Sequence, residues 1–128
     1  MIPNKTVYEN VAFAMEVAGR TDEEIREDVP HALELVGLTK KAWSFPKELS
    51  DGEQQRVAIA RSLINEPKII FADEPTGNLD SKNSKILFDL FFKLRDDYNC
   101  SVVIVTHNES NANICDRKLL IVDGEIKN

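Results

Sequence analysis

Two short apolar runs in the second half of the sequence are each followed by side chains that can do chemistry. Asp73 and Glu74 come directly after the run 69–72, and His107 lies two residues beyond the run 102–105. Such runs are typical of parallel strands buried on both faces, whose carboxyl ends meet at the edge where open α/β proteins bind ligands. Neighbouring side chains on a strand point in different directions. One carboxylate can therefore hold Mg²⁺ through its water shell while the other orients an attacking water.

His107 would lie beside those acids, where it could contact a phosphate oxygen or the attacking water. Each motif also has a structural interpretation. Solvated acids often end a strand, and a histidine after a strand often has only a packing role. The sequence alone leaves both interpretations open for each motif.

A third motif starts a predicted helix. Ser50, Asp51, Gly52 and Glu53 form a capping box, in which a hydroxyl and a carboxylate satisfy the first amides of a helix. Free amides and the helix dipole at such a start can bind an anion, although an ordinary capped helix has the same sequence. Together the motifs favour a functional interpretation. They occur in one order along the chain, and the segment 75–80 follows directly after the two acids.

The elements before the acids are predicted to be helical. Capping boxes at Thr6 and Thr21 begin two amphipathic helices, and Gly19 and Gly37 are suited to end them. Pro30 lies inside the second apolar stripe, where it should kink the helix or force a new start. A third helix follows the box at Ser50, with apolar positions Val57, Ile59, Ala60 and Leu63.

The second half changes to an α/β pattern. A helix is predicted over 81–98, between the two apolar runs, and strand, helix and strand at this spacing predict a parallel, right-handed βαβ unit. A third strand is predicted over 119–122, before a turn at Asp123-Gly124. The inward-facing positions expected in the long helix are Ile86, Leu87, Leu90, Phe91 and Leu94.

We therefore predict an α/β protein in two parts. A helical subdomain that includes the serine-headed helix covers 1–66, and a partial α/β core covers 67–128, with the boundary near 65–68. The formal net charge of −6 argues against a broad nucleic-acid surface. No stretch has the apolar length of a membrane span, and the first residues lack the pattern of a signal peptide. We expect a cytosolic chain with reduced cysteines, connected to a membrane only through a partner.

The combined motifs resemble those of the ATP-binding-cassette (ABC) ATPases. Residues 50–80, followed by His107, look like the signature, Walker B, D-loop and switch-histidine series of that family. The amino-acid sequences of residues 52–61 and 72–80 are similar to those of one branch of the family, which includes lipoprotein-releasing, macrolide-exporting and cell-division ATPases. Residues 5–11 resemble the segment just after the glutamine loop. The resemblance spans nearly the whole chain and implies the C-terminal part of a P-loop NTPase fold.

The resemblance also implies roles for individual residues. Asp73 would position Mg²⁺, Glu74 would be the general base for water, and His107 would be the switch histidine. In the family, two cassettes hold two ATP molecules head to tail, and the helical part docks an integral membrane permease. Such a chain would be cytoplasmic and peripheral to the membrane. The residues that would contact nucleotide or cross the dimer interface are Ser50, Asp51, Gly52, Glu53 and Asp80.

The sequence departs from the family pattern at the phosphate loop. None of its five glycines precedes Lys-Ser or Lys-Thr, and the family places that loop upstream of Met1. Because the loop supplies most phosphate contacts, we expect these 128 residues alone neither to bind ATP tightly nor to hydrolyse it. The neighbouring strands would also be absent, leaving sheet edges unpaired and apolar faces uncovered, which favours association.

A second departure is Asp51, which stands where the family's signature has its first glycine. A carboxylate in the first turn suits the helix dipole. The same charge would face a γ-phosphate, and two unit charges about 4 Å apart repel by about 4 kcal/mol at an effective dielectric near 20. We expect ATP binding at the site that Asp51 faces to be weakened, even in a complete cassette.

Two functions other than an ATPase subunit are also compatible with parts of the sequence. A non-catalytic module could use its helical half to dock a permease or to pair with an intact cassette. A chromosome or repair ATPase shares the signature, but such proteins carry long coiled coils, and the sequence has no sustained heptads. Its net acidity also disfavours that class.

Overall fold

The first half of the chain is helical, as predicted. The computed structural model describes residues 1–127, and three of its helices begin at the predicted capping boxes. The hydroxyls of Thr6, Thr21 and Ser50 each accept a hydrogen bond from the third helical amide, while a glutamate reaches back to the cap. The helical elements are α1 (Val7–Val17), α2 (Asp22–Leu35), the 3₁₀ turns η1 (Thr39–Lys41) and η2 (Pro46–Glu48), and α3 (Asp51–Leu63).

Helix α2 continues through Pro30, and no new helix starts there, contrary to one of the two predicted outcomes. Pro30 lies on the exposed side of the helix, and the opposite stripe buries Ile25, Val29 and Leu33. Packing of this stripe stabilises the helix. The helix can therefore tolerate the loss of the one backbone hydrogen bond that proline, which lacks an N–H, cannot donate.

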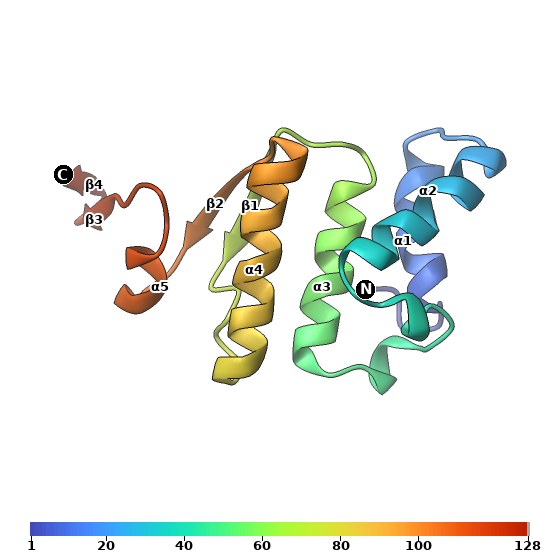
Figure 1. Cartoon of the computed structure of the whole chain (residues 1–128), viewed down its shortest axis with the longest axis horizontal. Helices are drawn as coiled ribbons and strands as arrows, with labels where there is room; N and C mark the ends of the chain where they lie inside the picture. Colours follow the sequence, from blue (N-terminus) through green and yellow to red (C-terminus); the bar gives the residue numbers. More distant parts are fainter. Residues whose placement is uncertain (128) are drawn as a thin grey trace.

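The second half contains the predicted βαβ unit. Strands β1 (Ile69–Asp73) and β2 (Ser101–Val105) are parallel, and helix α4 (Ser81–Tyr98) connects them. Ile69 pairs with Ser101 and Asp73 with Val105, so both strands end at the same edge of the sheet. In Figure 1, the starts of α3 and α4 and the carboxyl ends of both strands lie toward the same lower side of the molecule.

The two strands are buried on one face only, which corrects the prediction that both faces would be covered. Ile70 is 7% exposed, whereas its neighbour Phe71 is 78% exposed. On β2, Val103 and Val105 are also exposed, at 43% and 57%. Helix α4 and α3 cover the inner face, and nothing among residues 1–127 covers the outer one. Alternation along a strand therefore separates a core face from a bare apolar face.

The accessible surface supports this picture of an incompletely covered core. It is 8546 Å², whereas a compact monomer of this mass exposes on the order of 6,900 Å². The excess, about 1,600 Å², is as large as the total area buried in a standard protein–protein interface. The uncovered face agrees with the predicted tendency to associate, and association itself stays a prediction.

Helix α4 buries a slightly different stripe from the predicted one. Leu87, Leu90, Phe91 and Leu94 are buried as expected, but Ile86 is 37% exposed and Phe88 is 4% exposed. Successive helical residues are about 100° apart, so Phe88 and Ile86 lie at opposite edges of the stripe centred on Leu87. Phe88 packs against the ring of Phe91, with centroids 5.7 Å apart.

The end of the chain forms a separate hairpin. After the short helix α5 (Glu109–Asn113), strand β3 (Leu120–Val122) pairs antiparallel with β4 (Glu125–Lys127). Asp123 and Gly124 both have positive φ, at 51° and 77°, which confirms the predicted turn and suits a two-residue hairpin. The strand predicted over 119–122 begins at Leu120, and its pairing with β4 was not predicted.

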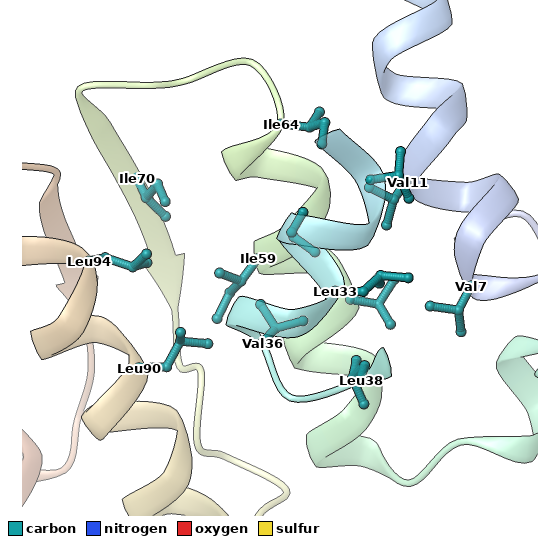
Figure 2. Packing of buried hydrophobic residues seen from close by; sticks show 14 of the residues in the cluster. Val7, Val11, Leu33, Val36, Leu38, Ile59, Ile64, Ile70, Leu90 and Leu94 are labelled. Atoms are coloured by element: carbon teal, nitrogen blue, oxygen red, sulfur yellow. The ribbon is translucent and has the colours of Figure 1, made fainter. Parts of the chain in front are cut away.

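One continuous core joins the two halves through α3, which lies between the α1–α2 pair and α4 (Figure 1). Figure 2 shows Ile59 of α3 near Leu90 of α4, with Ile70 of β1 and Leu94 beside them. Val7, Val11 and Leu33 extend the same cluster into the helical half. The division into parts at 1–66 and 67–128 stays a prediction, although α3 ends at Leu63 and β1 begins at Ile69.

Candidate functional site

The structure brings Asp73, Glu74 and His107 to one edge of the sheet, where β1 and β2 end. The backbone N–H of His107 donates to Glu74 Oε1 at 2.7 Å, and the Thr106 hydroxyl donates to Glu74 Oε2 at 3.3 Å. The amide of Glu74 in turn donates to the carbonyl oxygen of Val105 at 2.7 Å. We call Asp73, Glu74, Thr106 and His107 the acid–histidine rim.

The backbone of Glu74 is in the left-handed region, with φ of 45°. This conformation is uncommon for residues other than glycine and costs on the order of 1 kcal/mol or more. It lets the chain turn sharply out of β1 so that the Glu74 carboxylate reaches across to the end of β2. Strain of this kind often accompanies functional positions.

The imidazole of His107 is free to meet a ligand. Its Nε2 lies 3.8 Å from Glu74 Oε1, and its side chain is 99% exposed. The main-chain amide of His107, rather than the ring, therefore holds Glu74 in place. The ring can turn toward a group bound above the rim.

Asp73 lies at the last position of β1 and is exposed. No three His, Cys, Asp or Glu side chains converge on a metal position anywhere in residues 1–127. A single exposed carboxylate suits Mg²⁺, which commonly keeps several waters and is bound through one or two carboxylates together with phosphate oxygens. Asp73 thus fits the predicted water-mediated contact and would not hold the ion alone.

The serine-headed helix start forms as its capping box predicts. Ser50 Oγ accepts from the Glu53 amide at 3.2 Å, and Glu53 Oε1 accepts from the Ser50 amide at 2.9 Å. The amides of Asp51 and Gly52 donate to no group among the described residues. Asp51 itself is exposed in the first turn. Two open amides and a dipole here favour an anion, and the Asp51 carboxylate opposes one.

Asp80 caps α4 close to this helix start. Its Oδ1 accepts from the amide and from the side chain of Asn83, at 2.8 and 2.9 Å. Gly52 is buried against the same asparagine, since a Cβ added at Gly52 would lie 3.1 Å from Asn83 Oδ1. Asn83 therefore connects the starts of α3 and α4, and a glycine at position 52 allows this close approach.

The predicted site residues thus form two groups. Ser50, Asp51, Gly52 and Glu53 lie with Asp80 at the helix starts, and no hydrogen bond or ion pair in residues 1–127 joins them to the acid–histidine rim. The helices that carry the first group begin at the side of the molecule toward which β1 and β2 run (Figure 1).

Sequence reasoning missed three polar contacts at these groups. Thr106 was recognised only as the residue before His107, and Asn83 had no predicted role, although its place three residues after Asp80 is a capping signal. Asn111 of α5 donates to the Thr76 hydroxyl at 2.8 Å and joins the segment after Glu74 to the segment after His107. No sequence spacing indicates that last contact.

The Glu53 carboxylate makes the stability of this region depend on pH. The hydrogen bond from the Ser50 amide is the main cause that lowers the pKa of Glu53, and Lys41 and Arg56 add to it. A carboxyl group with a lowered folded-state pKa stabilises the fold above its unfolded pKa, about 4.3. That contribution disappears as the pH falls through the folded-state pKa.

We expect Glu53→Gln to lower the free energy of unfolding at pH 7 by about 0.5 kcal/mol, because the amide keeps the cap but loses the charge near the helix dipole. Between pH 5 and pH 3, the variant should lose less stability than the parent. Urea unfolding at several pH values measures both effects. Glu34→Gln is the matched control, since the exposed Glu34 side chain makes no hydrogen bond in residues 1–127. Parallel pH curves for the parent and Glu53→Gln would contradict the prediction.

Comparison with known proteins places these motifs in a family. The sequence model of the ABC transporter family matches residues 1–77. The lipoprotein-releasing system ATP-binding protein LolD of Cytophaga hutchinsonii is 48% identical over 126 residues, which cover 98% of this chain and 58% of that protein. The cell division ATP-binding protein FtsE of Streptococcus pneumoniae is 45% identical over 124 residues, covering 97% and 54%.

A solved structure has the same fold. The dimeric, post-hydrolysis structure of the ATP-binding cassette MJ0796, bound to ADP and Pi, superposes with a TM-score of 0.84 at 39% identity. It covers 100% of this chain and 57% of the cassette chain. The chain thus spans a little over half the length of the curated relatives it matches. The comparisons confirm the predicted P-loop NTPase fold, and the chain belongs to the ABC transporter ATP-binding family.

Proposed function

We propose that this chain supplies the hydrolysis residues of an ABC transporter ATP-binding subunit, which couples ATP hydrolysis to a membrane partner. Glu74 would act as the general base for the attacking water, and His107 would contact the γ-phosphate or that water. Asp73 would hold Mg²⁺ through water. The observation that carries the proposal is the Glu74 carboxylate, fixed by the His107 amide and the Thr106 hydroxyl at the carboxyl edge of two parallel strands.

The serine-headed helix start would serve a second subunit. We propose that Ser50 and Gly52 contact the γ-phosphate of ATP held by a partner cassette, and that Asp80 lies at the interface between the two. The separation of this group from the acid–histidine rim supports the proposal, because one chain then offers two half-sites on the same side. The MJ0796 cassettes that resemble this chain are dimeric.

Mg²⁺ and ATP are the ligands in this proposal. Asp73 suits the metal, and the open amides of Asp51 and Gly52 suit an anion, as described above. ATP when bound would supply the phosphoryl group that water attacks, and Glu74 would hold the proton taken from that water.

We further propose that these 128 residues alone neither bind ATP tightly nor hydrolyse it. No glycine in them precedes Lys-Ser or Lys-Thr, so the amides and lysine that usually hold β- and γ-phosphates are not in this sequence. The second candidate function, a docking module that pairs with a permease or an intact cassette, is favoured by the same observation.

The partners in this proposal are a second ATPase subunit and an integral membrane permease. No helix among residues 1–127 is both long and apolar enough to cross a membrane. We propose that the chain is cytoplasmic and reaches the membrane through the permease.

A chimera tests these proposals. A phosphate-loop-bearing segment of a relative such as the Cytophaga hutchinsonii protein would be joined to residues 1–128, and Mg²⁺-dependent phosphate release would be measured for the chimera and for the chain alone. We expect turnover by the chimera and none by the chain alone. ATP binding by the chimera without turnover would refute the hydrolytic role, and turnover by the purified chain alone would refute the proposed dependence on the loop.

A further inference from the structure

The helix that follows His107, α5, is too short to be stable on its own. It has five residues, none of them buried, and isolated helices need on the order of 12 residues to be even marginally stable in water. Its own start contributes one side-chain hydrogen bond, in which Asn108 Oδ1 accepts from the Asn111 amide at 3.1 Å. Contacts with other segments must therefore hold α5 in place.

One such contact joins α5 to the turn after the proposed general base. Asn111 Nδ2 donates to the Thr76 hydroxyl oxygen at 2.8 Å, and both residues are half-buried. No other hydrogen bond among residues 1–127 joins α5 to a segment before β2. Asn113 of the same helix is exposed, and its side chain accepts only from Lys118, at 2.8 Å. We call the Asn111–Thr76 hydrogen bond the α5 bridge.

The turn that carries Thr76 begins at Glu74. The carbonyl oxygen of Glu74 accepts from the Gly77 amide at 3.1 Å, and that of Thr76 accepts from the Leu79 amide at 3.1 Å. Glu74 has a positive φ, a conformation that persists only where the surrounding contacts enforce it. A contact that restrains Thr76 therefore also restrains the backbone of Glu74.

On its other side, the α5 bridge acts on the segment around His107. Thr106 Oγ1 accepts from the Asn108 amide at 3.0 Å and donates to Glu74 Oε2 at 3.3 Å. The His107 amide donates to Glu74 Oε1 at 2.7 Å. These bonds fix residues 106–108 to the Glu74 carboxylate, and the α5 bridge fixes the helix that follows them to the turn of Glu74. The contacts thus close a ring that runs from Glu74 through His107 and α5 back to Glu74.

We propose that Asn111 is a positioning residue for the proposed hydrolysis. Through Thr76 it keeps the Glu74 carboxylate and His107 in the arrangement in which they would meet the attacking water and the phosphate. Asn111 itself would touch neither nucleotide nor water. The inference rests on the proposed function, because it requires Glu74 to act as the base. Since a small displacement of a reacting group can lower a rate strongly, loss of the α5 bridge should act on the chemical step.

Steady-state kinetics of the chimeric cassette test this role. Asn111→Ala removes the donor, and we expect kcat to fall about tenfold while the KM for ATP stays within about twofold, because ATP binding does not use the position of Glu74. Thr76→Val removes the acceptor and should give the same fall. The double variant should fall no further, since both changes break one bond. Thr76→Ser, which keeps the hydroxyl, should recover most of the kcat that Thr76→Val loses.

Asn113→Ala is the matched control. It makes the same substitution on the same helix at an exposed position, and it should keep the parental kcat. Equal kcat for Asn111→Ala and Asn113→Ala would overturn the proposal, because the α5 bridge would then only stabilise the helix. Losses that multiply in the Asn111→Ala/Thr76→Val variant would also overturn it, because the two residues would then act separately.

Amide hydrogen exchange, measured on the chimera without nucleotide, tests the α5 bridge independently of turnover. In Asn111→Ala, the His107 amide should exchange about fivefold faster, the factor that corresponds to one ordinary hydrogen bond. Asn113→Ala should leave that exchange unchanged. Parental exchange of the His107 amide in Asn111→Ala would refute the positioning role whatever the kinetics show. A parental chimera without turnover would instead refute the proposed function, so the two failures are distinguishable.

Discussion

Replacement of Glu74 with glutamine is expected to lower the ATP turnover of the chimeric cassette by about 10²- to 10⁴-fold, the range for loss of a general base. The Glu74 carboxylate lies at the carboxyl edge of the sheet, where a bound nucleotide and its attacking water would meet it. An amide of the same shape cannot take a proton from that water. ATP binding should change little, because binding does not use the basicity of Glu74.

The fold should survive this change. The oxygen of a glutamine can still accept from the His107 amide, which now lies 2.7 Å from Glu74 Oε1. The Thr106 hydroxyl can accept from the new amide nitrogen instead of donating to an oxygen. Lost turnover with unchanged unfolding in urea would therefore identify a chemical role rather than a structural one.

Asp89→Asn is the control for this experiment. Asp89 lies on the exposed side of α4 and pairs with Lys85 at 2.8 Å, and such a surface pair contributes little to stability. Its variant should keep the parental turnover. A Glu74→Gln chimera that keeps more than about a tenth of the parental rate would contradict the role of Glu74 as the base.

The helices and the edge of the sheet could be predicted because local chemistry determines them. The capping boxes at Thr6, Thr21 and Ser50 place each helix start, since a hydroxyl and a carboxylate at this spacing satisfy amides within the same segment. Asp73 and His107 could be placed at one edge because parallel strands of similar length end together.

The atoms that make contact at that edge could not be predicted. The sequence indicates His107 as a partner of Glu74, but the structure uses its main-chain amide and leaves the imidazole exposed. That choice depends on the positive φ of Glu74, an unusual conformation for this residue type. The Asn111–Thr76 contact joins helix α5 to the turn after Glu74, 35 residues away in the sequence, and only the tertiary fold brings them together.

Burial of the strands failed as a prediction for a different reason. An apolar run such as 69–72 shows that both faces of a strand are suited to burial, but it contains no information about which elements cover them. Ile70 is buried in the core beside residues of α3 and α4 (Figure 2), whereas Phe71 on the opposite face is 78% exposed. The apolar residues of a strand thus predict which of its faces are suited to burial, and the surrounding elements determine which faces are buried.

Asp51→Gly is expected to raise the turnover of the chimeric cassette by at least tenfold. The carboxylate stands at a helix start with two open amides, and the proposed ligand there is the γ-phosphate of a partner's ATP. Two unit charges about 4 Å apart repel by about 4 kcal/mol at an effective dielectric near 20, which sets an upper limit of about a thousandfold. Glycine also removes the Cβ that would keep the backbone away from the phosphate.

The same change should lower stability. Asp51 is in the first turn of α3, where a negative charge favours the helix, and glycine adds backbone freedom, so we expect a loss of about 1 kcal/mol in urea unfolding. Asp22→Gly makes the same substitution in the first turn of α2, away from both candidate groups. That control should lose similar stability and keep the parental turnover.

Asp51→Asn separates charge from size. It removes the negative charge but keeps the Cβ, so turnover near that of Asp51→Gly would assign the effect to electrostatics, and turnover near the parental value would assign it to close approach. Equal turnover of the parent, Asp51→Asn and Asp51→Gly would refute the idea that Asp51 faces a bound phosphate. Asp51→Gly should raise turnover and lower stability, whereas Asp22→Gly should lower stability alone. Only a ligand at the start of α3 explains this difference.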